Sequence, residues 1–241
     1  MRTSLRLALR AYSAPFHWDG KDWLIAGGGC ALTGLSSAAD VSLRDALMRS
    51  HSSAAGHAAD AGIAYGDGLN VAIGVAGLYT VGLLVREPWL RETVMLAGTA
   101  TLVSASISTV TKFIVGRARP YTGSGNHFFK PLAFSEDHVS FPSGHTVVAF
   151  SVSSVLAERI GNPWATAGLY ALASLTGAGR MYRDGHWLSD VVPAALYASV
   201  IGRSMVQWFE SDKGEASSSL DLLPGPSSLT LVWRFNLTSA R

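Results

Sequence analysis

The sequence has little cysteine and little charge, and each shortage excludes a class of protein. Its 241 residues include one cysteine, Cys30, so no disulfide can form within the chain, and no cysteine–histidine cluster indicates a zinc site. Charged residues make up 15% of the chain, whereas soluble domains usually carry about a quarter. With a hydrophobic fraction of 48% and a mean hydropathy of +0.24, this shortage indicates that lipid solvates much of the surface.

A strong excess of one charge sign is also missing. The net charge is +2 and the basic residues are scattered, so we expect no nucleic-acid partner. The first residues lack the uninterrupted apolar core of a secretory signal. Residues 1–21 are instead predicted to form an amphipathic lead-in, with Arg2, Arg6 and Arg10 on the cytoplasmic side of a membrane.

Six apolar segments follow the lead-in, and we predict that each forms a transmembrane helix. They span residues 22–39, 68–85, 93–116, 144–158, 164–179 and 188–209. Several are shorter than the ~20 apolar residues that a lone spanning helix needs, and all are rich in small residues that let helices pack closely in lipid. The expected fold is an all-α bundle of six transmembrane helices over residues 22–209. A soluble all-α bundle with buried helices is the alternative.

The connections between the segments predict their place relative to the membrane. The short connections 86–92 and 158–163 would lie on the side of the N-terminus. The longer connections, 40–67, 117–143 and 180–187, would lie on the opposite side. Six spans bring both termini to one face, which the positive-inside rule assigns to the cytoplasm.

The C-terminal tail, residues 210–241, has a different character. It begins with a linker-like stretch that is rich in serine and charged residues. Further on, LTLVWRF (229–235) alternates apolar residues in the manner of a strand. This strand can pair with LDLL (220–223) across PGPSS, or the tail can be a disordered end.

The first motif whose side chains could take part in binding or catalysis, KFIVGRARP, ends the third segment. Lys112 and Arg119 are seven residues apart, close to two helical turns, so they would share one helix face. Pro120 should end the helix at that point. An ammonium group and a planar guanidinium together suit the oxygens of a phosphate. Two cations that extend from a helix end to the membrane interface would give the same pattern without a function.

The second motif, SFPSGHT, predicts a helix start. Ser143 can cap the helix, and the amides of Ser143, Gly144 and His145 would form an anion site at its N-terminus. Gly144 lets the backbone approach a ligand closely. The alternative is an ordinary capped helix with a histidine on its surface.

The third motif, GRMYRDGHWLSD, joins the last two segments and contains Arg180. Its His186 and Asp190 are four residues apart, so they would be neighbours on a helix. A carboxylate beside an imidazole fixes the tautomer and leaves the other nitrogen free to attack. The alternative is an interfacial helix start, with Trp187 in the aromatic belt. All three motifs fall on one predicted face, and charges at membrane depth usually mark a functional site.

Together the motifs K-x6-R-P, P-S-G-H and R-x5-H-x3-D resemble the signature of the type 2 phosphatidic acid phosphatase superfamily. This superfamily includes lipid phosphate phosphatases, undecaprenyl-pyrophosphate phosphatases, soluble class A acid phosphatases and vanadium haloperoxidases. The resemblance covers roughly residues 40–205. One position departs from the pattern, because Gly179 stands where the family usually has serine. This departure puts in doubt an accessory contact near the phosphate.

The resemblance implies a bundle of the phosphatidic acid phosphatase type 2/haloperoxidase kind and a role for each motif residue. His186 would attack phosphorus to form a phosphohistidine, and Asp190 would hold its ring. His145 would protonate the leaving oxygen and then activate water. The phosphate oxygens would be bound by Lys112, Arg119, Ser143, Gly144 and Arg180. No cofactor and no metal ion is expected, since fixed cations neutralise the phosphate.

The expected function is that of an integral membrane phosphatase with a lipid phosphate or pyrophosphate monoester as substrate. We expect it in the cell inner membrane with the site facing the periplasm or exterior, and with the lipid substrate and the bilayer as its partners. The alternatives are a phosphotransferase that uses the same site with an acceptor other than water, and a non-catalytic lipid-binding membrane protein.

Overall fold

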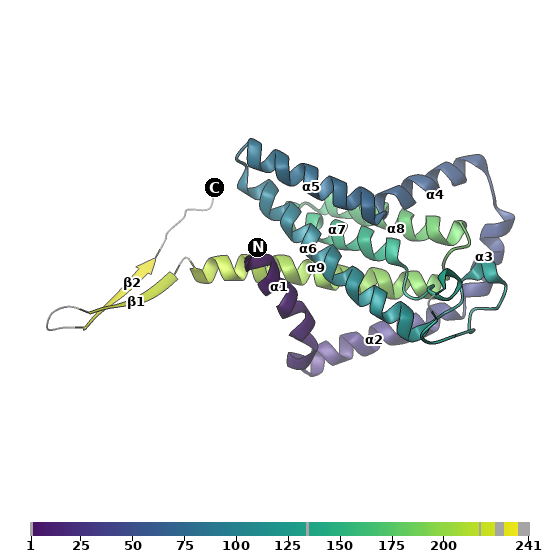
Figure 1. The fold of residues 1–241 in the computed structure, drawn as a ribbon, viewed down its shortest axis with the longest axis horizontal. Coiled ribbons are helices and arrows are strands. Elements are labelled where there is room, and N and C mark those ends of the chain that lie inside the picture. The colour runs from purple at the N-terminus through teal and green to yellow at the C-terminus, as the bar shows by residue number, and fades with distance from the viewer. Residues whose placement is uncertain (1, 134, 217, 225–228, 236–241) are drawn as a thin grey trace.

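The computed structural model describes residues 2–133, 135–216, 218–224 and 229–235, and these residues are mainly helical (Figure 1). The α-helices are α1 (Arg2–Ser13), α2 (Gly20–Ser37), α3 (Asp40–Arg49), α4 (Ser53–Tyr65), α5 (Gly68–Leu84), α6 (Pro88–Val115), α7 (Gly144–Ile160), α8 (Pro163–Tyr182) and α9 (Leu188–Ala216). Short 3-10 turns cover Ala14–His17, Pro120–Thr122 and Glu136–His138. The prediction of an all-α bundle with a short C-terminal tail is confirmed.

The centre of the bundle is formed by α6, α7, α8 and α9, with α7 packed against the other three. One group of buried apolar side chains joins α1, α6, α7 and α9: Leu7, Leu96, Ala97, Ala100, Val103, Val155, Met205, Val206 and Phe209. A second joins α7, α8 and α9: Val147, Ala149, Phe150, Ala173, Ala194 and Ala198. Many of these residues are alanine or valine, whose small side chains let the helix axes approach closely. The helix ends that carry the three motifs are therefore fixed relative to one another.

Each of the six predicted segments coincides with a helix over most of its length, but the number of membrane crossings is not confirmed. In the part of the chain that the structure describes, α6 alone is long and apolar enough to cross a bilayer by itself. Two bent helix pairs are long and apolar enough when each pair is taken as one span: α2 with α3, bent by 52°, and α4 with α5, bent by 54°. At 17 residues α7 is short for a lone span, and α8 and α9 are rich in small and polar residues.

The stretch 40–67, predicted as a long loop, is helical. It forms α3 and α4, and α4 lies along α8. Glycine permits this contact, because a Cβ on Gly62 would lie 2.6 Å from the carbonyl oxygen of Leu175. The prediction of a loop was wrong because α4 is short and stabilised by packing on α8, which no local sequence pattern records.

Ion pairs tie the end of the bundle that lies away from the three motifs. Arg6 and Arg10 of α1 pair with Asp212 of α9, at 3.8 and 3.6 Å. Arg159, near the end of α7, pairs with Glu210 of α9. The N-terminal helix and the last turns of α9 therefore lie together at that end of the bundle.

The C-terminal tail differs from its prediction at the start and agrees with it further on. α9 continues to Ala216, so the stretch predicted as a linker from residue 210 begins as helix. The strands β1 (Ser218–Pro224) and β2 (Leu229–Phe235) pair antiparallel, with Leu222 opposite Leu231, so the hairpin is confirmed. The turn between the strands, residues 225–228, lies outside the described residues.

Candidate active site

The first motif leaves its helix earlier than its spacing predicts. α6 ends at Val115 because Gly116 takes a left-handed conformation with φ of 60°, and a side chain there would overlap the carbonyl oxygen of Lys130. Arg119 lies beyond this turn in extended backbone. The prediction that Lys112 and Arg119 share one face of a helix is therefore wrong, because the glycine ends α6 between them.

Lys112 and Arg119 are nevertheless both anchored to the loop that follows α6. The Lys112 ammonium donates to the carbonyl of Val139 at 2.7 Å, and Nε of Arg119 donates to the carbonyl of Glu136 at 2.9 Å. Each of these bonds uses one donor of a side chain that carries three or more, so both cations keep donors for a ligand.

Arg180, in the last turn of α8, is the third cation of the predicted set. Its guanidinium lies beside Gly185, close enough to Lys112 and Arg119 for the three like charges to act on one another. The Nε atom of Arg180 is buried and has no hydrogen-bond partner among the described residues. Buried donors are normally satisfied, so this atom points to an acceptor supplied by a ligand.

The N-terminus of α7 lies against Lys112, since a Cβ on Gly144 would be 3.7 Å from the lysine Cε. Gly144 occupies the first position of the helix, where α7 itself offers no acceptor for the N–H. Ser143 differs from its prediction, because its amide donates to the carbonyl of Asp190 at 3.0 Å. Its hydroxyl accepts from Thr146 at 2.9 Å and makes no cap. A phosphate contact from Ser143 therefore falls to its hydroxyl group.

The structure brings His186 and Asp190 together, as their spacing predicts. Nδ1 of His186 lies 3.5 Å from Oδ2 of Asp190. The buried carboxylate also accepts from the Ser140 hydroxyl at 2.6 Å and from the Trp187 amide at 2.8 Å. Burial lowers the pKa of His186 to about 3, so its ring is neutral near pH 7. A carboxylate at Nδ1 favours the tautomer with the proton there, which leaves the lone pair on Nε2.

Two buried charged residues behind this pair, Arg117 and Asp40, had no role assigned from the sequence, although Arg117 was counted among the basic residues of the site. Arg117 is 3% exposed and donates to Asp190 at 2.6 Å and to Asp40 at 2.8 Å. Asp40 is 1% exposed and is the first residue of α3. Arg117 stands inside the first motif between Gly116 and Ala118, and these small neighbours are the one sequence signal of its burial. No signal marks Asp40 beyond its place at the end of an apolar segment.

His145 is the other histidine at this end of the bundle. Its Nε2 lies 3.9 Å from Oδ2 of Asp67, which caps α5 with its other oxygen. The positive charges of Lys112, Arg119 and Arg180 are close enough to His145 to interact with it electrostatically. An imidazole placed between cations and a carboxylate can give up a proton to a leaving oxygen and take one from water. Asp67 was not singled out in the sequence.

Gly179, the one departure from the family pattern, has a physical explanation. A Cβ there would lie 2.6 Å from the carbonyl oxygen of Ala59 and 3.1 Å from its Cα. Neither atom belongs to a flexible side chain, so serine at position 179 would require α4 to move away from α8.

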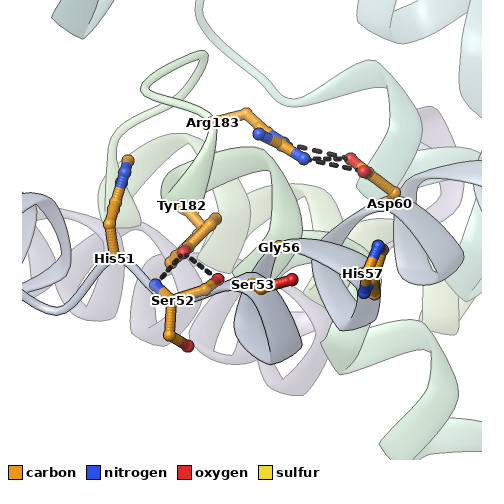
Figure 2. Close-up of a pocket in the computed structure, with 8 residues that line it drawn as sticks. All are labelled: His51, Ser52, Ser53, Gly56, His57, Asp60, Tyr182 and Arg183. Atoms are coloured by element: carbon orange, nitrogen blue, oxygen red, sulfur yellow. Dashed lines mark hydrogen bonds and ion pairs between the residues drawn. The ribbon is translucent and has the colours of Figure 1, made fainter.

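A separate polar pocket of about 440 Å³ lies between α4 and the end of α8 (Figure 2). It is lined by His51, Ser52, Ser53, Gly56, His57, Asp60, Tyr182 and Arg183. Figure 2 shows Arg183 turned toward Asp60, to which it donates at 2.7 Å, and the Tyr182 hydroxyl bonded to the backbone of Ser52. Arg183 lies three positions after Arg180, but none of the predicted site residues lines the pocket.

The arrangement is suited to a phosphate-sized anion. Three cations, the first turn of α7 and two imidazoles gather at one end of the bundle. In the described part of the chain, no group of three or more His, Cys, Asp and Glu side chains is placed to hold a metal ion. A neutral imidazole backed by a carboxylate, with a second imidazole nearby, is a constellation for nucleophilic attack on phosphorus with proton transfer.

Comparison with known proteins gives matches for the same region of the chain. A family model described as the PAP2 superfamily matches residues 93–213, half of the chain. A lipid A 1-phosphatase from Porphyromonas gingivalis is 32% identical over 93 residues, 38% of this chain and 18% of that protein. An acid phosphatase from Zymomonas mobilis is 38% identical over 60 residues, 25% of this chain and 22% of that protein. The matches thus span about a fifth of the length of these two relatives.

Two solved structures share the fold. Aquifex aeolicus LpxE superposes with a TM-score of 0.52 at 20% identity, over 70% of this chain and 94% of that chain. A transmembrane PAP2 type phosphatidylglycerolphosphate phosphatase from Bacillus subtilis superposes with a TM-score of 0.55 at 17% identity, over 88% of this chain and 98% of that chain.

Proposed function

Because this chain belongs to the PAP2 superfamily, we propose that it is a membrane-embedded phosphatase that hydrolyses a lipid phosphate or pyrophosphate monoester through a phosphohistidine. His186 is the nucleophile, Asp190 orients it, and His145 is the acid and base. The phosphate oxygens are bound by Lys112, Arg119 and Arg180, with the amide of Gly144 and the hydroxyl of Ser143.

The first half-reaction transfers the phosphoryl group to the enzyme. The lone pair on Nε2 of His186 attacks phosphorus while the bond from phosphorus to the leaving oxygen breaks. The negative charge of the bound phosphate favours the protonated ring of His145, which takes a proton from solvent as the substrate binds. His145 then gives the proton to the leaving oxygen, so the lipid leaves as an alcohol or a shorter phosphate. Asp190 accepts a hydrogen bond from Nδ1 of His186, which stabilises the positive charge that the ring acquires.

The second half-reaction regenerates the enzyme. His145, now neutral, takes a proton from water as the water oxygen attacks phosphorus and the phosphorus–nitrogen bond breaks. Inorganic phosphate leaves, and His186 is neutral again. In both steps the three fixed cations stabilise the oxygens of the transferring phosphoryl group, which bear the developing charge.

The observation that carries the proposal is the state of Arg180. Its Nε is buried without a partner among the described residues, next to two further cations and near two histidines. Leaving a buried guanidinium nitrogen unbonded is costly unless a ligand supplies the acceptor. A phosphate oxygen is the acceptor that the surrounding positive charge selects.

The lipid part of the proposal has other support. Large apolar side chains on α2 and α5 are more than two thirds exposed, among them Leu24, Leu35, Leu69 and Leu84, which suits contact with lipid chains. One relative is named a lipid A 1-phosphatase and one structural neighbour a transmembrane phosphatase. We place the protein in a cell inner membrane with the site facing the periplasm or exterior, since Arg6 and Arg10 lie at the opposite end from the site.

The experiment is phosphate release by the purified protein in detergent micelles. The substrates are lipid A phosphate, phosphatidate, phosphatidylglycerophosphate, undecaprenyl pyrophosphate and a soluble aryl phosphate. We expect turnover of at least one lipid, and loss of that turnover in the His186→Asn variant with the same elution profile as the wild type. Hydrolysis of the soluble ester alone would refute the lipid substrate. Substantial turnover by His186→Asn would refute the phosphohistidine.

A further inference from the structure

Arg117 lies between two buried carboxylates, and it touches no group that would contact substrate. Its Nη1 atom donates to Asp190 at 2.6 Å and its Nη2 atom to Asp40 at 2.8 Å. The rest of the guanidinium is also bonded, to the Ser189 hydroxyl and, through Nε and Nη2, to the carbonyl of Asn126. A guanidinium this fully bonded has a fixed position, and it fixes the carboxylates on either side of it.

Asp40 is also bonded to the first turn of α9, the helix that begins two residues after His186. Its Oδ1 accepts from the Ser189 amide at 2.9 Å and its Oδ2 from the Ser189 hydroxyl at 2.6 Å. Ser189 precedes Asp190 in the first turn of α9. The first residue of α3 is therefore bonded to the backbone beside the carboxylate that orients His186.

The charges in this cluster determine how strongly Asp190 can stabilise a cation on His186. Arg117 alone would neutralise Asp190, because an ion pair at 2.6 Å in a buried site leaves little field for a third group. Asp40 pairs with the other terminal nitrogen of the guanidinium. Asp40, Arg117 and Asp190 together therefore carry one negative charge. The ring of His186 becomes positive when it is phosphorylated, and the four groups then sum to zero.

We propose that Asp40 and Arg117 are positioning residues for the nucleophile. Arg117 sets the orientation of Asp190, and Asp40 offsets the charge of Arg117, so that the negative charge of Asp190 remains available to the phosphohistidine ring. This inference rests on the proposed function of the site. The bond that forms is Nε2–phosphorus and the bond that breaks is phosphorus–oxygen, while the proton on Nδ1 stays on the ring.

The test compares Asp40→Asn with Asp45→Asn, a matched control on the exposed face of α3. Asparagine keeps the shape of aspartate and removes its charge. We expect kcat to fall about 10- to 100-fold in Asp40→Asn and to remain at the wild-type value in Asp45→Asn. The inhibition constant of inorganic phosphate, which binds to the three cations, should change less than about threefold in both variants. Equal kcat in the two variants, or a parallel loss of phosphate binding in Asp40→Asn, would overturn the inference.

A double variant separates charge from structure. Asp40→Asn with Arg117→Gln removes both charges and restores the net charge of the cluster to that of Asp190 alone. We expect its kcat to exceed that of Asp40→Asn about tenfold, whereas a structural role predicts a further loss because more bonds are broken. A double variant less active than the single one would overturn the inference, as would failure of both to fold. A wild-type protein inactive on every phosphate ester would instead refute the proposed function.

Discussion

Two arginines at the site have opposite bonding, and each state has its own consequence. The guanidinium of Arg117 is bonded on every side by the protein. The Nε of Arg180 is buried without a partner among the described residues. Protein acceptors that satisfy a cation fix its neighbours, whereas a cation left unsatisfied binds a ligand. We therefore expect substitution of Arg117 alone, which leaves two buried carboxylates without their cation, to affect folding as well as the reaction, and substitution of Arg180 to affect the reaction alone.

Arg180→Lys keeps the charge and removes the planar fork. We expect kcat to fall about 10²- to 10³-fold, as for the loss of one donor to a transition-state oxyanion. The thermal midpoint should stay near the wild-type value, because no protein bond to Nε is lost. The control is Arg183→Lys, one turn along α8, where the arginine is exposed and paired with Asp60. Equal activity of the two variants would contradict the assignment of Arg180.

The buried state of His186 predicts a pH dependence of stability. Its pKa is about 3 in the folded protein and near 6.5 when the chain is unfolded, so the fold favours the neutral ring. The stabilisation is complete above pH 6.5 and is lost as the pH falls toward 3, because only the unfolded state gains the proton. Between pH 7.5 and 4.5 the loss from this residue is roughly 2–3 kcal/mol.

The measurement is chemical unfolding in detergent at those two pH values. His186→Asn should lose less stability on acidification than the wild type by that amount. His127→Asn, which changes an exposed histidine in the loop after α6, should behave as the wild type. An unchanged pH dependence in His186→Asn would show that the ring is not held neutral by burial.

The three motifs taken together predicted which residues gather at the site, because Lys112, Arg119, His145, Arg180 and His186 belong to three short signatures. The motifs could not predict the contact between Arg117 and Asp40. These two residues are 77 positions apart, and their contact depends on how α3 packs against the start of α9. The amide of Ser143 was assigned to the phosphate for the same reason, since its true acceptor lies on another helix.

The distance between α4 and α8 is set by glycine, on the scale of secondary-structure elements. Gly62 faces Leu175 and Gly179 faces Ala59 at distances that exclude a Cβ. The end of α8 carries Arg180, so the contact between α4 and α8 also fixes the position of one of the three cations.

Gly179→Ala should therefore destabilise the protein, by about 1–3 kcal/mol for an overpacked contact, and should lower activity as the end of α8 shifts. The measurements are the thermal midpoint in detergent and phosphate release. Gly168→Ala is the matched control, since this glycine lies on the same helix and a Cβ added there would meet nothing within 4 Å. If the two variants have the same midpoint, the close approach of α4 and α8 does not constrain the helices.

Apolar segments predicted where helices form but not all of the helices. Segments such as 93–116 and 188–209 are long enough for their composition to be decisive. α3 and α4 are 10 and 13 residues long, mixed in character, and held by contacts with α8 and α9. Short helices depend on tertiary packing, which a single sequence does not display.

On the scale of the whole molecule, the bundle carries the candidate site at one end, and the N-terminal helix lies with the last turns of α9 away from it (Figure 1). Arg6, Arg10 and Asp212 link the N-terminal helix to the last turns of α9, away from the site. This polarity predicts that the two ends face different compartments when the protein is in a membrane.

Cysteine labelling tests this prediction, because the chain has one native cysteine to remove. In a Cys30→Ser background, Ser124→Cys places a thiol in the loop beside the site and Ser211→Cys places one at the far end of α9; both serines are exposed. In spheroplasts, a membrane-impermeant maleimide should label position 124 and should label position 211 only after lysis. Labelling of both positions before lysis would contradict the two-sided arrangement, and the reverse pattern would invert it.

The bond between Arg117 and Asp40 also bears on how this protein can be divided or recombined. The family model begins at residue 93, yet the carboxylate that balances Arg117 is contributed by α3, far upstream. A fragment or chimera that keeps the family region and replaces the first 87 residues would retain every signature motif and lose that partner. In the proposed phosphatase, α3 therefore belongs to the support of the nucleophile and is not interchangeable with another helix.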